Sequence, residues 1–194
     1  MTARPPFIHN EQIADLICRL RTEYGILSAI PVEVEEFAEL DLEIELIPFP
    51  GLRAEVNADA FISRDFQSIL IDNDYYNMDK MRPRVRFSIA HELGHLFLHK
   101  DYFLEQCPMA TEDEWREFMR DMDDYTHICL EKQANLFAAL LLMPADDFLA
   151  NVRNRVSFST MTRRYAVSTG VIERRLQDFD VKPEVDRIFL NGNN

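Results

Sequence analysis

The chain of 194 residues is long enough for one well-buried domain with a small appendage, and too short for two large domains. Its hydrophobic share of 47% and charged share of 28% are those of a globular protein, which excludes a disordered or fibrous chain. Its formal net charge of −13 would repel nucleic-acid phosphates, which excludes general DNA binding by the molecule as a whole.

The N-terminal residues carry a charge but no apolar stretch after it, so they do not resemble a secretory signal. The longest apolar run, residues 136–143, is far shorter than a membrane span. Three cysteines without C-x-x-C spacing argue against a disulfide framework and against a cysteine zinc site. We therefore expect a cytoplasmic protein.

The first part of the chain predicts two helices followed by a small sheet. Asn10 is a suitable N-cap for a helix whose apolar residues recur at helical spacing, and Gly25 ends it. A short second helix is expected around residues 34–40. Three short segments rich in Ile, Leu, Val and Phe then predict a small antiparallel sheet. They cover residues 42–49, 58–63 and 68–72.

Helices are expected from there onwards. Pro83 opens a helix that runs to about His99, and Thr111 caps a strongly acidic helix with Trp115 in its buried stripe. A further helix, from about residue 127 to residue 143, is so apolar in its second half that it must be buried. It is the core helix of an α+β domain.

The end of the chain differs in charge from the rest. Residues 151–194 hold 8 Lys and Arg against 5 Asp and Glu, a net of +3, whereas residues 1–150 hold 13 against 29, a net of −16. Two short helices, at about 159–165 and 168–179, have the spacing of a helix-turn-helix. We expect this pair to stabilise the fold or dock a partner rather than read DNA. The predicted organisation is an α+β domain at 1–150 with a helical tail at 151–194 packed on it.

The sequence His91-Glu92-Leu93-Gly94-His95 predicts a metal centre. Residues four apart on a helix differ by about 40° in azimuth, so His91 and His95 can direct their imidazoles at one ion. Glu92 lies about 100° round the helix, beside the ion, where it suits a general base. Gly94 leaves space next to the ligands.

A catalytic zinc ion needs a third protein ligand, and we choose Glu131. It stands at the start of the buried helix, where a carboxylate without a cationic partner would be unfavourable. Periodicity alone leaves His127, four residues earlier on the same face, as a competing ligand. His99 continues the histidine spacing, but we expect it beside the ligands and not on the ion, because the azimuth has drifted by about 80° and the helix is ending.

Four blocks of the sequence, taken together, resemble the ImmA/IrrE family of metallopeptidases. The strongest are F-S-I-A-H-E-L-G-H-L-F-L-H at residues 87–99 and E-x-x-A-N-x-F-A-A-x-L-L-M-P at residues 131–144. The H-E-x-x-H pattern alone is only moderately specific, and the second block in the right order makes the resemblance strong. The remaining blocks are Y-G-I followed by P-V-E-V at residues 24–34, and A-F-I-S-R at residues 60–64.

The resemblance implies a zincin-like fold with a gluzincin-like centre. Carried over, His91, His95 and Glu131 would bind one zinc ion, with manganese as the alternative metal, and Glu92 would be the base. This resolves the choice between Glu131 and His127 in favour of the glutamate. Asn135 would order the helix packing around the ligands. Four residues are candidates to stabilise the oxyanion, namely Tyr75, Tyr76, Tyr102 and Tyr125.

The resemblance also implies a substrate class, a helix-turn-helix transcriptional repressor whose cleavage relieves repression in mobile-element or stress-response control. The rival hypothesis is a regulator that binds a repressor or antitoxin-like partner without cutting it. This sequence departs from the family pattern in a long acidic insertion at residues 105–124. We expect that insertion to be a solvated helix, and the alternative is an acidic wall around Asp121, Asp123 and Asp124 that attracts a basic substrate.

Overall fold

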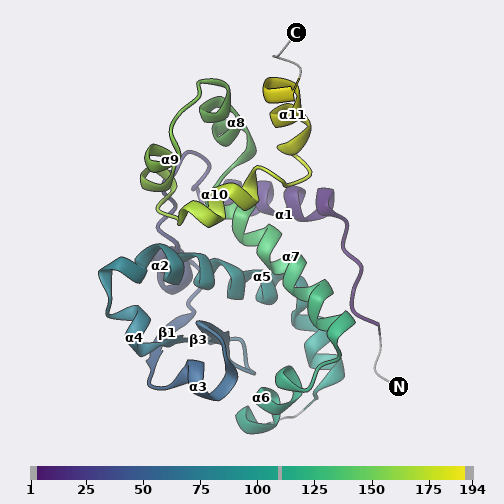
Figure 1. The fold of residues 1–194 in the computed structure, drawn as a ribbon. Coiled ribbons are helices and arrows are strands. Elements are labelled where there is room, and N and C mark those ends of the chain that lie inside the picture. Colours follow the sequence, from purple (N-terminus) through teal and green to yellow (C-terminus); the bar gives the residue numbers. More distant parts are fainter. Residues whose placement is uncertain (1–3, 109–110, 191–194) are drawn as a thin grey trace.

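Two long helices, α5 (Arg82–Gln106) and α7 (Asp124–Leu142), form the centre of the computed structural model, which describes residues 4–108 and 111–190 (Figure 1). Pro83 lies in the first turn of α5, where its missing N–H has no helical partner to lose. The prediction that this helix ends near His99 is wrong. It continues because Phe103 is fully buried, with its ring 5.1 Å from that of Trp115.

The two helices are in close contact at Gly94. A Cβ atom there would lie 2.9 Å from the Cα atom of Ala134 and 3.2 Å from the Cβ atom of Phe137. The expected space at Gly94 is thus filled by the backbone of α7. This contact sets the distance between the helix that carries the two histidines and the helix that carries Glu131.

Replacing Gly94 with alanine should therefore destabilise the fold. Alanine favours a helix over glycine by about 1 kcal/mol, but overpacking a tight crossing costs about 1–3 kcal/mol. We expect a net loss of about 1–2 kcal/mol in the free energy of unfolding, measured by urea denaturation. Gly170→Ala is the matched control, because nothing lies within 4 Å of a Cβ at that helical position, and it should leave stability unchanged or raise it.

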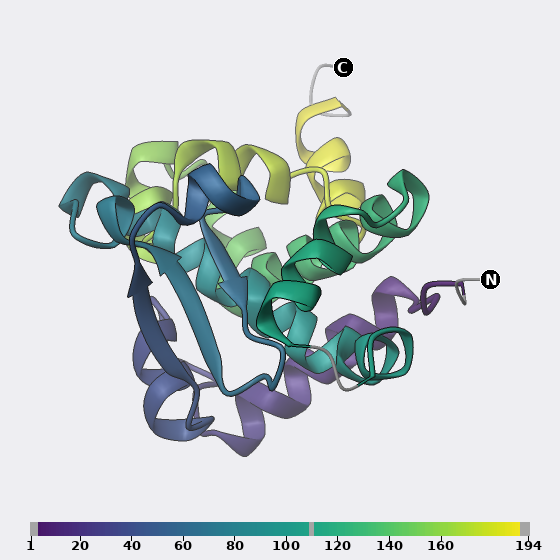
Figure 2. The same ribbon diagram turned by 90° about the horizontal axis from the view of Figure 1, so that it is seen from below.

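The sheet has three strands in the order β1-β3-β2, with β1 at Glu45–Phe49, β2 at Ala60–Ile62 and β3 at Ser68–Asp72. They lie side by side as one layer against the helices (Figure 2). The prediction of an antiparallel sheet holds for β2 and β3, and it is wrong for β1 and β3, which are parallel. A parallel pair needs a long crossover. Helix α3 (Leu52–Val56) and strand β2 supply it.

The remaining helices before α7 cover this centre. The prediction that Asn10 caps the first helix is wrong, since Asn10 is the first residue of α1 (Asn10–Glu23) and His9 is its N-cap. The helix buries Ile13, Ile17 and Leu20. The acidic helix α6 (Glu112–Arg120) has the expected Thr111 cap. The short elements are α2 (Val34–Glu36), which continues as the π-helical turn η1 (Phe37–Asp41), α4 (Asn73–Tyr76) and the 3-10 turn η2 (Asp79–Met81).

The C-terminal segment consists of four helices on one side of α5 and α7 (Figure 1). They are α8 (Ala145–Arg153), α9 (Phe158–Tyr165), α10 (Thr169–Arg175) and α11 (Lys182–Leu190). Only α9 and α10 were expected, and α10 ends earlier than predicted. Met161, Tyr165 and Ile172 belong to the same buried cluster as the rest of the fold. Because α8 runs through residue 150, the division into 1–150 and 151–194 stays a prediction.

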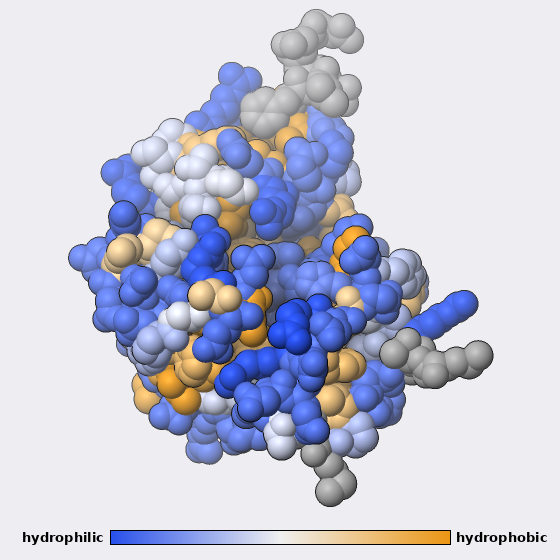
Figure 3. All heavy atoms as spheres, turned by 60° about the horizontal axis from the view of Figure 1, so that its bottom comes forward, coloured by the Kyte–Doolittle hydropathy of each residue, from blue (hydrophilic) through white to orange (hydrophobic). Residues whose placement is uncertain are grey.

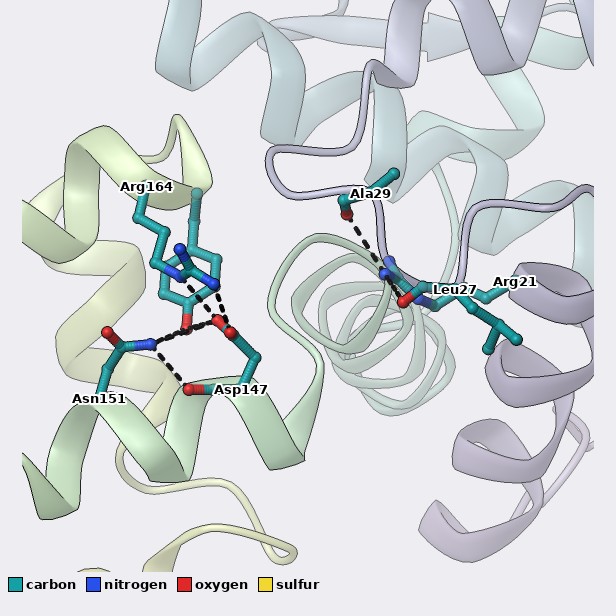
Figure 4. Close-up of polar contacts among 7 residues, drawn as sticks. Arg21, Leu27, Ala29, Asp147, Asn151 and Arg164 are labelled. Atoms are coloured by element: carbon teal, nitrogen blue, oxygen red, sulfur yellow. Dashed lines mark hydrogen bonds and ion pairs between the residues drawn. The ribbon is translucent and has the colours of Figure 1, made fainter.

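Two buried arginines bind the C-terminal end of α7. Arg21 of α1 donates to the carbonyl oxygen of Leu141 at 2.7 Å, and Arg175 of α10 donates to that of Met143 at 3.2 Å. Arg21 also donates to the carbonyl oxygens of Leu27 and Ala29 (Figure 4). Carbonyls at a helix end have no helical partner, so these bonds satisfy them. Elements from both ends of the chain thus hold the same turn.

A polar cluster around Asp147 joins α8 to α9. Arg164 donates to both oxygens of Asp147, at 2.5 and 2.8 Å, and the Tyr165 hydroxyl donates to Asp147 Oδ2 at 2.7 Å. Asn151 lies beside the same carboxylate (Figure 4). These bonds, with Arg164 foremost, hold the pKa of Asp147 below its usual value.

In the described part of the chain, no single helix is long and apolar enough to cross a membrane. By length and composition, α7 and α8 pass that test only as a pair, which is bent by 70°.

Candidate metal centre

Three side chains from the two central helices converge on one point. His91 and His95 lie one turn apart on α5, and their Nε2 atoms are 3.1 Å apart. Glu131, on α7, places one carboxylate oxygen 3.3 Å from His91 Nε2 and the other 3.2 Å from His95 Nε2. The group can hold a metal ion, since one donor atom from each residue lies within 4.8 Å of the others.

The donor set fits a small divalent ion. Metal bonds of about 2.0–2.1 Å at tetrahedral angles separate neighbouring ligand atoms by roughly 3.3 Å. The shortest distance between each pair of these side chains is close to that value, with each histidine nearest to a different oxygen of Glu131. Two imidazoles and one carboxylate are also ligands that zinc accepts, and three protein ligands leave a fourth position open. The three side chains expected as ligands thus lie together, and their binding of a zinc ion stays a prediction.

Glu92 lies next to this group in a buried position. Its side chain accepts a hydrogen bond at 3.0 Å from the backbone N–H of Ile62 on β2, so the sheet orients it. Burial raises the pKa of Glu92 to about 7, with His91 and the Ile62 N–H opposing the shift. The sequence did not reveal the partner of Glu92, because a backbone donor on a separate strand leaves no motif.

The three converging groups shift one another's protonation. Burial lowers the pKa of His91, but the hydrogen bond with Glu131 and the nearby carboxylates outweigh it, and the pKa is raised. Burial dominates at His95, whose pKa is lowered. Burial opposes ionisation of Glu131, yet its contacts with the imidazoles of His91 and His95 hold its pKa far below the usual range. Glu131 is therefore an anion, as a metal ligand must be.

A series of hydrogen bonds that begins at its Nδ1 atom orients the ring of His95. His99 Nδ1 lies 3.0 Å from His95 Nδ1, His99 Nε2 lies 2.9 Å from Gln133 Oε1, and Gln133 Nε2 donates to the carbonyl oxygen of Pro6 at 3.0 Å. Burial and the neighbouring His95 lower the pKa of His99 to about 3, so its ring is neutral at pH 7.

The directions of these bonds follow from the fixed acceptor at Pro6. A carbonyl only accepts, so Gln133 turns its amide nitrogen to Pro6 and its oxygen to His99. His99 then donates from Nε2 and accepts at Nδ1, which requires His95 to donate from Nδ1. The lone pair of His95 Nε2 is left for a metal ion, as it is in sites where an outer partner fixes the ligand tautomer.

Replacing His99 with leucine should therefore weaken metal binding. The substitution leaves the Nδ1–H of His95 without an acceptor, and loss of such a partner lowers metal affinity by roughly 10–100-fold. Competition with a chromophoric chelator measures the affinity. His127→Leu is the control, since His127 lies one turn before Glu131 and is outside the group of three, and the metal affinity of this variant should stay near that of the unmodified protein. Unchanged affinity of the His99 variant would contradict the tautomer argument.

The group opens into a cavity of about 610 Å³ between β2, α5, α6 and α7. The face with the sheet and α6, turned forward in Figure 3, is largely hydrophilic and hollowed near its centre. His127 lines the cavity one turn before Glu131, which places the competing ligand near the group but not in it. In the described part of the chain, none of the four candidate tyrosines lines this cavity.

Few carboxylates of the acidic insertion line the cavity. Arg116, Met119 and Arg120 are the residues of α6 that line it. Asp123 accepts a hydrogen bond from the Thr126 N–H and so caps α7, while Asp121 accepts one from Arg120. Of the three aspartates in the proposed acidic wall, only Asp124 lines the cavity. The solvated-helix interpretation accounts for most of the insertion.

Asn135 extends the site along α7. It lines the cavity and forms a side-chain hydrogen bond that raises the pKa of His91. This contact is of the kind expected for it, since it orders a neighbour of the ion and is outside the group of three. Gln133, in contrast, was missed, because nothing in the sequence linked it to His99.

Comparisons with known proteins agree on the fold. The family model Peptidase_M78, described as the IrrE N-terminal-like domain, matches residues 75–177, which is just over half of the chain. Among solved structures, a Mycobacterium tuberculosis transcriptional regulator is similar, with a TM-score of 0.56 and 19% identity. That likeness covers 88% of this chain and 56% of the regulator, so the chain spans about half of that protein. No curated protein sequence matches.

Proposed function

Because this chain belongs to the IrrE N-terminal-like family of peptidases, we propose that it is a zinc metallo-endopeptidase of the H-E-x-x-H, gluzincin-like type. His91, His95 and Glu131 are the proposed ligands, and Glu92 is the proposed base. The observation that carries this proposal is the convergence of the three donor atoms beside a buried glutamate. Manganese is the alternative metal.

The proposed reaction is hydrolysis of a peptide bond. A bound zinc ion supplies a Lewis acid for the carbonyl and lowers the pKa of water. Glu92, held by the Ile62 N–H, takes a proton from the attacking water and returns it to the leaving amine. Glu131 stays ionised and can therefore bind the metal ion. The hydrogen bonds through His99 keep His95 in the tautomer whose Nε2 atom has a free lone pair.

Metal stoichiometry tests the ligand assignment. Glu131→Ala and His95→Ala should each lose the metal, because two ligands hold zinc far more weakly than three. Elemental analysis of the purified proteins gives the stoichiometry, and far-UV circular dichroism checks that they are folded. A folded variant that retains one ion per chain would remove that residue from the ligand set.

The proposed substrate is a helix-turn-helix transcriptional repressor, cut in the cytoplasm to relieve repression in mobile-element or stress-response control. The family resemblance supports this class. The second candidate is a regulator that binds a repressor or antitoxin-like partner without cutting it. The presence of Glu92 favours the enzyme, since a binding protein has no chemical need of a buried base.

Co-expression with a repressor encoded nearby separates the two candidates. A fragment that appears with the unmodified protein and disappears with Glu92→Gln supports cleavage. A stable complex with an intact repressor in both cases supports the binding protein instead.

A further inference from the structure

A second cavity, of about 340 Å³, lies between α5, α7 and α10 and adjoins the metal centre. Phe87 and Asn135 line both cavities. Phe87 precedes His91 by one turn of α5, and Asn135 follows Glu131 by one turn of α7. One turn displaces a residue by about 6 Å along the axis, and an extended peptide advances about 3.3 Å per residue. The second cavity is therefore within reach of a peptide residue one or two positions from a carbonyl at the metal centre.

The walls of this cavity combine apolar surface with charge. Phe87, Leu136, Ala139 and Val171 supply the apolar part. The one carboxylate in the lining, Asp178, accepts a hydrogen bond from the buried guanidinium of Arg175 at 3.0 Å and is thus already engaged.

Among the described residues, Lys132 and Arg174 are the two cations of the lining without an ion pair at contact distance. Both line the cavity and both are exposed. Within residues 4–108 and 111–190, neither forms an ion pair. Arg174 acts on Asp178 only at longer range, through its charge, and Arg175 is the cation that Asp178 contacts directly. In a chain with 34 acidic against 21 basic residues, the cavity thus has two cations without a described carboxylate in contact. An anion bound in the cavity would be attracted by both cations and could accept charge-assisted hydrogen bonds from them.

We propose that this cavity is a subsite that binds an acidic side chain of the polypeptide substrate, one or two residues from the bond to be cut. The inference rests on the proposed peptidase function and adds a substrate preference to it. Glutamate fits better than aspartate, because its longer methylene stem reaches along the apolar wall to the two cations. A basic side chain is disfavoured by like charge, and an apolar one leaves both cations unpaired.

A binding selection tests the preference without relying on catalysis. Glu92→Gln protein, loaded with zinc and immobilised, is exposed to a library of short unstructured peptides, and the bound peptides are sequenced by mass spectrometry. We expect enrichment of glutamate at one position. In the Lys132→Glu, Arg174→Glu double variant of the same protein, the enrichment should change to lysine or arginine. Arg19→Glu with Arg163→Glu is the matched control, since it makes the same charge change at exposed residues outside both cavities and should keep the glutamate preference.

Affinities measured by fluorescence anisotropy give the magnitude. Exchanging the selected glutamate for glutamine should weaken binding about tenfold, which corresponds to about 1.4 kcal/mol. Three results would overturn the subsite: no bound peptides, no acidic preference, or an acidic preference that survives charge reversal at Lys132 and Arg174. Cleavage of the selected peptides by the unmodified protein is a separate readout. Charge-dependent binding without any cleavage would keep the subsite and refute the peptidase proposal.

Discussion

Replacing Glu92 with glutamine is expected to abolish hydrolysis and to leave the metal bound. Glutamine has nearly the same shape, and its carbonyl oxygen can still accept the hydrogen bond that the Ile62 N–H donates at 3.0 Å. It cannot take a proton from water, and loss of a positioned base lowers the rate by roughly 10²–10⁴-fold. The proposed ligands His91, His95 and Glu131 are untouched, so the metal content should stay at one ion per chain.

The measurement combines turnover of a cleaved substrate with elemental analysis of the same sample. Glu39→Gln is the control, because Glu39 is exposed and lies outside the cavity, and it should show full activity. Full activity of Glu92→Gln would show that another group acts as the base. Loss of the metal together with activity would show that Glu92 supports the ligands instead.

Replacing Arg175 with leucine is expected to destabilise the fold by about 3–5 kcal/mol, because it leaves two partly buried carboxylates without their buried cation. Arg175 is fully buried. It donates to Asp178 at 3.0 Å, to both oxygens of Asp180 at 2.6 and 2.8 Å, and to the carbonyl oxygen of Met143. All of these acceptors would lose a donor at once. Urea denaturation measures the loss as a fall in the unfolding midpoint.

The neighbouring Arg174 provides the control for this substitution. It is exposed and forms no ion pair among the described residues, so Arg174→Leu should change stability by at most about 0.5 kcal/mol. Adding Asp178→Asn and Asp180→Asn to the Arg175 variant removes the uncompensated charges and should recover part of the loss. If the triple variant is no more stable than Arg175→Leu, the carboxylates are not the source of the effect.

The convergence of His91, His95 and Glu131 could be predicted because most of its information is local. Helical spacing brings the two histidines to one side of a helix, and this needs no knowledge of the rest of the fold. Glu131 required more, since periodicity left His127 as a rival and the resemblance to a family decided between them. Asn135 was expected beside the ligands, but the partners of His99 and Glu92 could not be predicted. Gln133, Pro6 and the Ile62 N–H reach the site through packing between elements that are distant in the sequence.

The topology of the sheet also could not be predicted from the sequence. The segments that form β1, β2 and β3 were visible as short apolar runs, but their pairing depends on where the chain goes between them. A helix at Leu52–Val56 turns what could be a hairpin into a crossover, and its five residues are too few to show a clear period.

The sequence does contain features that predict the helix α8. Pro144 marks the end of α7, and it also occupies the N-cap of the next helix. Asp146 and Asp147 lie in the first turn of that helix, where carboxylates are favourable, and Phe148 and Val152 are a buried pair one turn apart. The end of α5 was missed for a different reason, since only the burial of Phe103 against Trp115 shows that the helix continues past His99.

The hydrogen bonds of Arg21 and Arg175 to the last turn of α7 limit how far the protein can be shortened. Residues 75–177, the span matched by the family model, contain Arg175 but not Arg21, so a fragment with these limits would leave the Leu141 carbonyl without its donor. The same cut would remove Ile62, which orients Glu92, and Asp180, which pairs with Arg175. The span matched by the family model is therefore shorter than the part of the chain that supplies the contacts of this centre.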